Sequence, residues 1–310
     1  MKYIDLHCDT LTAACGRGLN LSDCRLQTNA KKLNESSCAA QCFAVFTDGA
    51  NAAPQFEKYL NYYKNRIKLC NLLPVLSLKN LKQAMEENIT GAILTVENLG
   101  FISCADDVAK LYAAGVRMAS LVWNYENGLA YPNIVYKDGT PQPALRERRG
   151  LKPLGREVIK ALDECGVIVD ISHLSDGGAE EILNGRKIPV VASHSCAAQI
   201  KNVPRNLTDG LIKKIADCGG VVGVNFHKEF LGGNPFEKIL ENVKHVISVG
   251  GEDCVAFGSD FDGIPPYEEI PDCTAMPQLI EYLSSNGIKF RVLEKLCRKN
   301  FIRLFGDVCG

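Results

Sequence analysis

Apolar residues along the chain follow two patterns that alternate from one end to the other. Eight short runs are rich in Val, Ile, Leu and Ala and have the length of buried β-strands. These runs cover residues 2–9, 39–47, 91–96, 116–122, 167–172, 189–193, 220–225 and 254–259. Between most of them, apolar residues recur about every 3.6 residues, as on one face of an α-helix. This spacing predicts helices over residues 55–72, 153–165, 208–218 and 235–249.

Strands that alternate with helices are typical of a parallel sheet, because each helix carries the chain back to begin the next strand. Eight such units predict a closed (β/α)8 barrel, a TIM-barrel-like fold of the α/β class. The 310 residues, 46% of them hydrophobic, show no linker, internal repeat or change in composition. We therefore expect a single barrel domain over residues 1–310, covered by terminal helices over residues 277–305.

The segment over residues 124–151 interrupts this alternation. It follows the fourth predicted strand, contains Pro132, Pro141 and Pro143, and is longer than an ordinary strand-to-helix connection. In barrels of this type, the connections that follow the strands form the rim that carries the active site. We therefore expect a loop that acts as a lid or shapes a substrate pocket.

Charge and composition exclude several classes of function. The formal net charge is −1, so the basic footprint of a nucleic-acid-binding or membrane-surface protein is missing. No apolar run approaches the roughly 20 residues that span a bilayer, and no secretory signal precedes the first strand, so we expect a cytoplasmic protein. The fourteen cysteines include no C-x-x-C pair. They fit small, reduced, buried hydrophobic residues better than a disulfide framework or a zinc ribbon.

A candidate metal site begins in the first predicted strand. His7 and Asp9 are two residues apart, so on an extended strand both side chains leave the same face. Cys8, between them, is expected to point the other way. An imidazole nitrogen and a carboxylate oxygen presented together are half of a divalent metal site.

Other metal-ligating residue types end later runs: Glu97, His173, His194 and Asp260. Because a parallel barrel delivers the carboxyl ends of all its strands to one rim, we expect these side chains to meet there. Three imidazoles with two or three carboxylates exceed what one tetrahedral zinc takes. Two metals about 3.5–4 Å apart that share a carboxylate use this set better, and Glu97 is a sensible bridge.

Each of these residues also has an ordinary structural explanation. A single histidine after a strand is more often packed or hydrogen-bonded than a ligand, Glu97 is able to cap a helix, and Asp260 is a common type of turn residue. These explanations do not account for all of them ending predicted strands together. His227 and His245 lack such a position and are not assigned to the metal.

The ordered motifs of the chain resemble those of the membrane (renal) dipeptidase family of zinc peptidases, in the amidohydrolase superfamily of barrels, and most closely its bacterial type. The resemblance covers nearly the whole chain. Its motifs are Asp5-Leu6-His7-Cys8-Asp9-Thr10, Val96-Glu97, Gly115-Val116-Arg117, Gly150-Leu151, Val169-Asp170-Ile171-Ser172-His173, Ser193-His194-Ser195, Arg205-Asn206-Leu207-Thr208-Asp209, Gly223-Val224-Asn225-Phe226, Gly258-Ser259-Asp260-Phe261-Asp262-Gly263 and Asn300-Phe301-Ile302-Arg303.

The resemblance implies a role for each matching residue. Two Zn²⁺ ions per chain are implied, with His7 and Asp9 on one, His173 and His194 on the other, and Glu97 bridging. Asp260 matches the family's acid/base residue beside a hydroxide that bridges the zincs. Arg205 matches the arginine that binds the terminal carboxylate of the substrate, which would restrict the enzyme to very short peptides. A homodimer is implied as well.

One position departs from the eukaryotic members of the family. They carry a histidine that stabilises the tetrahedral intermediate, where this chain has Trp123 followed by Asn124, as bacterial members do. Trp123 either donates through its indole N–H or walls the pocket. We assign Trp123 and Asn124, with Arg205, to substrate binding. His227, where related chains often have a tyrosine, is a further candidate for shaping the pocket.

The leading hypothesis is a metal-dependent dipeptidase that cleaves dipeptides, with L- or D-residues at the C-terminal position. One alternative is a binuclear amidohydrolase that acts on another small amide, such as an N-acyl amino acid or a cyclic amide. The other is a non-catalytic barrel that binds metal or peptide. The mixed nitrogen and oxygen ligands also admit manganese or cobalt in place of zinc.

Overall fold

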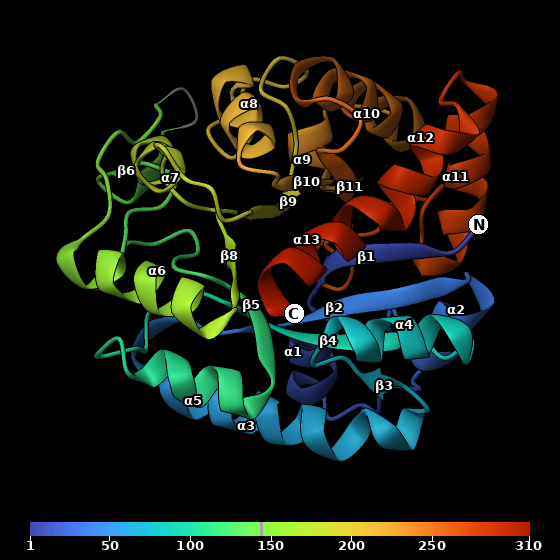
Figure 1. Cartoon of the computed structure of the whole chain (residues 1–310), viewed down its shortest axis with the longest axis horizontal. Coiled ribbons are helices and arrows are strands. Elements are labelled where there is room, and N and C mark those ends of the chain that lie inside the picture. The colour runs from blue at the N-terminus through green and yellow to red at the C-terminus, as the bar shows by residue number, and fades with distance from the viewer. Residues whose placement is uncertain (143–144) are drawn as a thin grey trace.

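The computed structural model describes residues 1–142 and 145–310 and contains a closed barrel of parallel strands surrounded by helices (Figure 1). The barrel strands are β1 (Tyr3–Cys8), β2 (Cys38–Phe46), β4 (Gly91–Glu97), β5 (Val116–Ser120), β8 (Ile168–Asp170), β9 (Val191–Ser195), β10 (Val221–Val224) and β11 (Val255–Phe257). They follow the order β2-β1-β11-β10-β9-β8-β5-β4, and β4 pairs again with β2, which closes the barrel. The short β3 (Leu73–Pro74) pairs with the start of β4. Each barrel strand falls on one of the eight predicted runs, so the predicted fold class is confirmed.

One end of the barrel is filled by apolar side chains and by the C-terminal helix. A cluster of buried residues takes members from every barrel strand, including Ile93, Met118 and Val221. Phe301 and Phe305 of α13 (Asn300–Cys309) belong to the same cluster. Figure 1 shows α13, in red, lying over the barrel at the end nearest the viewer. Because these residues precede the carboxyl ends of their strands, the opposite end is the one left for chemistry.

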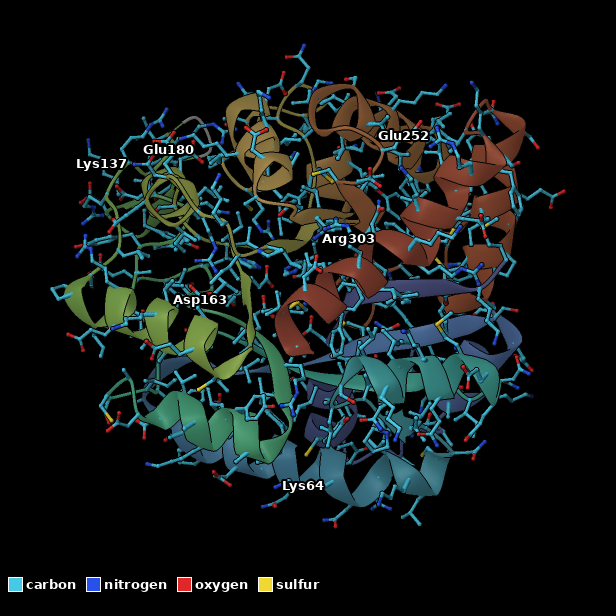
Figure 2. The ribbon with its side chains drawn as sticks, in the orientation of Figure 1. Lys64, Lys137, Asp163, Glu180, Glu252 and Arg303 are labelled. Atoms are coloured by element: carbon cyan, nitrogen blue, oxygen red, sulfur yellow. The ribbon has the colours of Figure 1, made fainter. Side chains whose placement is uncertain are left out.

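The helices pack around the barrel and across one end of it, and those that precede β11 connect its strands. They are α1 (Thr10–Gly16), α2 (Ala30–Glu35), α3 (Ala52–Arg66), α4 (Leu78–Glu86), α5 (Asp107–Ala114), α6 (Pro153–Cys165), α7 (Asp176–Leu183), α8 (Asp209–Asp217), α9 (Lys228–Leu231), α10 (Pro235–Gly250), α11 (Met276–Ser285), α12 (Phe290–Glu294) and α13. Individual residues determine where several helices begin and end. Thr208 caps the start of α8 by accepting from the backbone N–H of Leu211, and Gly166, with a φ of 73°, stops α6 directly after Cys165. Charged side chains such as Lys64 and Glu180 project outward at the periphery (Figure 2).

The predicted helix over residues 55–72 differs from the one observed. Helix α3 begins at Ala52, ends at Arg66 and is followed by a short 3-10 turn over Lys68–Cys70. Asn71 then takes a left-handed conformation with a φ of 54°, and the backbone N–H of Leu72 returns to the carbonyl of Ile67 at 3.1 Å. The apolar period continues past the helix because Ile67 and Leu72 are both buried in this turn.

The described parts of the long segment over residues 124–151, residues 124–142 and 145–151, are irregular apart from a small antiparallel hairpin. Its strands are β6 (Tyr136–Lys137) and β7 (Thr140–Pro141). Pro143, one of the three prolines noted above, lies outside the described residues. Arg146 ties the segment to the rim by donating to the carbonyls of Val203 and Asn206 at 3.2 and 3.0 Å. The segment therefore lies against the end of the barrel that carries the strand carboxyl ends.

The predicted terminal helices over residues 277–305 appear as α11, α12, a π-helical turn over Lys295–Lys299, and α13. No helix in the described part of the chain is long and apolar enough to cross a membrane. All fourteen cysteines, each within the described residues, are unpaired.

Candidate metal centre and active site

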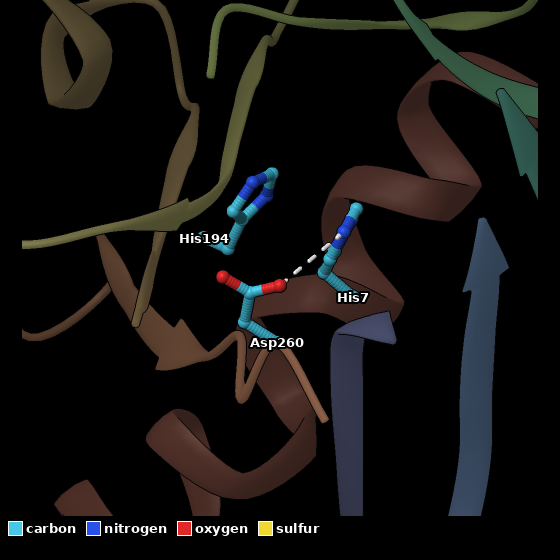
Figure 3. A group of neighbouring side chains, drawn as sticks. All are labelled: His7, His194 and Asp260. Carbon is cyan, nitrogen blue, oxygen red and sulfur yellow. Dashed lines mark ion pairs between the residues drawn. The ribbon is translucent and has the colours of Figure 1, made fainter. Parts of the chain in front are cut away.

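The side chains expected at the strand ends lie close together in the structure. The Nε2 atom of His7 is 3.4 Å from Oδ2 of Asp9 and 3.6 Å from Oε2 of Glu97. It is also 3.9 Å from Oδ1 of Asp260. Figure 3 shows the rings of His7 and His194 next to each other above the Asp260 carboxylate, with a dashed line between His7 and Asp260. This group brings together residues from β1, β4, β9 and the loop after β11.

Glu97 faces the histidines through both of its carboxylate oxygens. Its Oε2 atom faces His7, whereas its Oε1 atom is 2.9 Å from Nε2 of His173 and 3.6 Å from Nε2 of His194. The two Nε2 atoms of His173 and His194 are 2.9 Å apart. A residue with one oxygen toward each half of the cluster has the geometry required of a bridging ligand.

The backbone positions these side chains in different ways. Glu97 is the last residue of β4, and His194 lies within β9. His173 and Asp260 follow β8 and β11 and have left-handed backbones, with φ values of 66° and 67°. Such conformations are strained for residues other than glycine and persist only where the surroundings hold them. Here the N–H of Asn133 donates to the carbonyl of His173 at 2.7 Å, and the N–H of Asp260 donates to the carbonyl of His7 at 3.1 Å.

The sequence pattern predicts that Asp9 lies on an extended strand, and this prediction is wrong. Strand β1 ends at Cys8, and Asp9 precedes α1 with φ −96° and ψ 16°. The β1–β2 pairing also shifts register between Asp5 and Cys8. The turn into α1, rather than strand alternation, therefore brings the Asp9 carboxylate beside His7.

Burial and mutual charge alter the ionisation of the cluster. Burial lowers the pKa of His7, but the carboxylates of Glu97, Asp9 and Asp260 more than offset this and raise it to about 10. Burial raises the pKa of Asp260 to about 7. For His173 and His194, burial holds the pKa well below its ordinary value. These two imidazoles are therefore neutral at pH 7, the state that a metal ligand needs, whereas His7 would have to release a proton when a cation binds among the carboxylates.

The residues present fit a pair of divalent cations. Nε2 of His7 is buried and has no hydrogen-bond partner among the described residues. Its neighbouring carboxylate oxygens lie at 3.4 and 3.6 Å, too far for good hydrogen bonds. Two atoms that each bind one tetrahedral zinc at about 2.1 Å are separated by roughly 3.4 Å. Three sets of possible ligands occur here: His7, Asp9 and Glu97; Glu97, His173 and His194; and His7, His194 and Asp260.

Arg205 lies behind His194 and is buried. Its Nη1 group donates to Oγ of Ser195 at 2.8 Å, and its Nη2 group donates to the carbonyl of His194 at 2.7 Å. Its Nε atom is buried without a hydrogen-bond partner among the described residues. The guanidinium also lies over the ring of Phe230, 5.5 Å from its centroid. A buried donor without a partner is costly, but Arg205 is not among the residues that line the cleft, so in this structure its guanidinium supports His194 from behind.

The cleft above the cluster has a volume of about 330 Å³. Trp123 lines it, with its ring centroid 5.0 Å from Phe46 and 6.3 Å from His173. Asn124 also lines the cleft, but its Oδ1 atom is 2.9 Å from Nδ1 of His173. Trp123 is thus part of the wall, whereas Asn124 contacts a histidine of the cluster directly.

Several residues of the site were not assigned from the sequence. The cleft is also lined by Phe46, Phe230, Asp262 and His227. Of these, His227 is the one that the sequence analysis names as a candidate for shaping the pocket, without assigning it to the metal. Asn225 donates from Nδ2 to Oδ2 of Asp260 at 3.0 Å. The rule that polar residues at strand ends meet at the rim would have found Asn225, which ends the run over residues 220–225, and His227, which follows it. Phe46 and Phe230 carry no comparable signal.

A closed parallel barrel with buried histidines and carboxylates at its strand ends has the architecture of a metal-dependent barrel enzyme. Residues 1–309 match the model of the membrane dipeptidase family, peptidase family M19. The chain therefore belongs to this family, as the motifs had indicated, and is a metallopeptidase that hydrolyses peptide bonds. Family membership decides against the non-catalytic alternative.

Comparison with individual proteins agrees with the family and the fold. A Klebsiella pneumoniae protein from the 5′ region of pqqA is 33% identical over 251 residues, which cover 78% of this chain and 89% of that protein. The crystal structure of dipeptidase AC, a family M19 metallopeptidase, superposes with a TM-score of 0.90 at 23% identity, over 100% of this chain and 99% of that one. A Rhodobacter sphaeroides metallopeptidase, liganded with a phosphinate mimic of the dipeptide L-Ala-D-Ala, gives a TM-score of 0.89 at 22% identity, over 99% of both chains.

Proposed function

We propose that the protein is a dipeptidase that uses two divalent metal ions, zinc being the expected metal, to hydrolyse the peptide bond of dipeptides. The observation that carries this proposal is the position of Glu97, with Oε2 toward His7 and Oε1 toward His173 and His194. His7 and Asp9 would hold one ion, His173 and His194 the other, and Glu97 both. When bound, the ions would polarise the peptide carbonyl and lower the pKa of a shared water, so that hydroxide is available near neutral pH.

Asp260 is proposed to move the proton. Burial raises the pKa of Asp260 to about 7, and the positive charge of bound cations would lower it, so the carboxylate would be ionised and able to accept a proton near neutral pH. The hydrogen bond from Asn225 holds Oδ2 at 3.0 Å and leaves Oδ1, which faces His7, for the reaction. Asp260 would accept the proton of the attacking water at Oδ1 and deliver it to the amine nitrogen that leaves.

The cleft supports a small substrate with a terminal carboxylate. Its volume of about 330 Å³ suits a dipeptide better than a long chain. Arg205 is buried behind His194 and does not line the cleft; it is proposed to bind the C-terminal carboxylate through its unpaired Nε–H once the substrate displaces the intervening side chains. Trp123 is proposed to form the wall beside the substrate. The L-Ala-D-Ala mimic held by the Rhodobacter sphaeroides relative makes dipeptides with a C-terminal D-residue the first substrates to try.

The test is a dipeptide hydrolysis panel on metal-loaded and metal-stripped protein, with the bound metal counted by elemental analysis. We expect two zinc ions per chain and activity that disappears when they are removed. Asp260→Asn should lower kcat by about 10²–10⁴-fold, because a positioned acid or base contributes that much, and should retain the metal that His7 and Glu97 bind.

Two outcomes would contradict this function. One is full activity of the metal-stripped protein, and the other is an Asp260→Asn variant as active as the wild type. As a control for the role of Arg205, the same dipeptides are assayed with an amidated C-terminus. Loss of activity on the amides supports recognition of the carboxylate, whereas equal activity favours the alternative of an enzyme for other small amides.

A cytoplasmic location and a homodimer, both expected at the sequence level, stay predictions. Fractionation of the native cells and the mass of the purified protein in solution address them directly.

A further inference from the structure

Both histidines that face Oε1 of Glu97 have a hydrogen-bond partner on the other side of the ring. Nδ1 of His194 is 2.7 Å from Oγ of Ser193, and Nδ1 of His173 is 2.9 Å from Oδ1 of Asn124. We propose that Asp170 is a positioning residue that acts through Ser193 to hold His194 in the tautomer with its lone pair on Nε2. This inference rests on the proposed function, because Nε2 of His194 is the atom that would bind a metal ion.

The direction of the hydrogen bonds follows from the atoms involved. Oγ of Ser193 is 2.5 Å from Oδ2 of Asp170. The Asp170 carboxylate has no hydrogen to give when ionised, so Ser193 donates its only hydroxyl hydrogen to it. Oγ of Ser193 is then left as an acceptor toward His194, and the hydrogen between these two residues belongs to Nδ1 of the imidazole.

The surroundings keep the Asp170 carboxylate in place. Asp170 is the last residue of β8 and is buried. Its Oδ1 atom accepts from the backbone N–H groups of Ser172 and Ser193 at 2.9 and 3.0 Å. Oδ1 therefore accepts only from backbone N–H groups, one in β9 and one after β8. Oδ2 is the oxygen that faces the Ser193 hydroxyl. The arrangement is built across two neighbouring strands and does not depend on a mobile surface group.

His173 reaches the same tautomer with a different partner. The Oδ1 atom of an amide only accepts, so the hydrogen between Asn124 and His173 lies on Nδ1 of the ring. Asn124 therefore supports His173 as Ser193 supports His194. Groups behind a metal-binding histidine commonly fix its tautomer and ring orientation, and their loss weakens metal binding about 10- to 100-fold.

Asp170→Asn tests the relay with little change in shape. The oxygen of the new side-chain amide keeps the two backbone hydrogen bonds, which forces the NH₂ group of that amide to face Ser193. Ser193 must then accept from this NH₂ group, and its own hydrogen is released to turn toward Nδ1 of His194 or toward Oγ of Ser172, 3.3 Å away. The constraint that keeps the hydrogen of His194 on Nδ1 is thereby lost, and the tautomer with the hydrogen on Nε2, where the metal ion would bind, becomes accessible.

The experiment compares the wild type with Asp170→Asn in two measurements. Nitrogen-15 NMR of the histidine rings in metal-free protein should show the hydrogen of His194 on Nδ1 in the wild type and partly or wholly on Nε2 in the variant. Zinc titration should show one of the two sites weakened about 10- to 100-fold in the variant. Ser193→Ala, which removes the relay, should also weaken that site, and Ser193→Thr, which keeps a hydroxyl, should restore it.

Asp176→Asn is the matched control. Asp176 is also a buried aspartate on the same stretch of chain, but its partner is Arg146 at 3.3 Å. This variant should lose stability while keeping the wild-type tautomer and zinc affinity. The inference is overturned if Asp170→Asn keeps the His194 hydrogen on Nδ1, or if Asp170→Asn and Asp176→Asn bind zinc equally well. A wild-type protein that takes up no zinc overturns the proposed metal centre instead, a result that the titration alone reveals.

Discussion

Space around individual atoms limits which residues the site tolerates, and Gly263 illustrates this limit. A Cβ atom at this position would lie 2.7 Å from Oδ1 of Asp260 and would also meet Oδ2 of Asp9. The backbone of Gly263 is not left-handed, so an alanine meets no conformational barrier there. The glycine is required by the two carboxylates that approach it, and these are the groups that the proposed chemistry uses.

We expect Gly263→Ala to lower kcat/KM for dipeptides about 100-fold, because displacement of a reacting group by even 1 Å has an effect of roughly that size. The thermal midpoint of the metal-free variant should stay close to that of the wild type. Gly128→Ala is the control, since a Cβ atom there has nothing within 4 Å. A Gly263→Ala enzyme with wild-type zinc content and kcat/KM would show that this space is not needed.

At the scale of elements, hydrogen bonds and ion pairs of acidic side chains hold neighbouring segments together around the cleft. Asp262 accepts from Oγ1 of Thr10 at 2.6 Å and from the backbone N–H of Gln27 at 2.8 Å. It thereby joins the start of α1 and the segment before α2 to the loop that carries Asp260. Asp272 has a similar role further out, where Lys32 of α2 lies 3.0 Å from its Oδ2 atom.

The Asp272–Lys32 pair gives a prediction about pH. Burial would raise the pKa of Asp272, but hydrogen bonds from Thr274 and the Lys32 ammonium group more than offset this and hold it below its ordinary value. A depressed pKa in the folded state stabilises the protein above the unfolded pKa, about 3.9, and this contribution is lost as the pH falls through the folded value. Asp272→Asn should therefore lower the free energy of unfolding by about 0.5–1 kcal/mol at pH 7, and by less at pH 3.

Urea unfolding of the two metal-free proteins at both pH values measures this difference. A gap between wild type and variant that stays constant or widens at pH 3 would mean that the Asp272 charge is not the cause. A double-mutant cycle with Lys32→Met tests the partner. In a protein that already carries Lys32→Met, Asp272→Asn should lose most of its effect on the free energy of unfolding.

For the whole molecule, the candidate ligands connect distant parts of the chain. They come from β1, β4, β9, the turn after β1 and the loops after β8 and β11, so they span residues 7 to 260. An unfolded chain does not hold these side chains together. A metal ion that binds only the folded barrel must then stabilise it by mass action.

Zinc at about 100 times its dissociation constant should stabilise the metal-free protein by about 2.7 kcal/mol, seen as a rise in the thermal midpoint. His194→Ala should remove most of this rise because it deletes one proposed ligand. His245→Ala is the control: His245 pairs with Asp209 at 2.7 Å, outside the cluster, and the variant should respond to zinc as the wild type does. An equal rise in all three proteins would place the bound zinc elsewhere.

Much of the architecture was predictable because it depends on local pattern. The eight apolar runs became the eight barrel strands, and the helix predicted over residues 153–165 is α6. Parallel strands that share a direction must bring their carboxyl ends to one rim. This geometric rule is why His7, Glu97 and His194 were expected together before any distance between them was known.

Other features depend on how strands approach one another, and the sequence pattern alone did not decide them. Asp9 reaches the site through a turn rather than along a strand, and His173 and Asp260 are presented by left-handed backbones. The chain from Asp170 through Ser193 to His194 exists only because β8 and β9 are neighbours in the barrel. Residue order thus determined the fold and the chemical types available at the rim. Only tertiary contact decided which hydrogen bonds form there, because each depends on atoms from separate strands lying within about 3 Å.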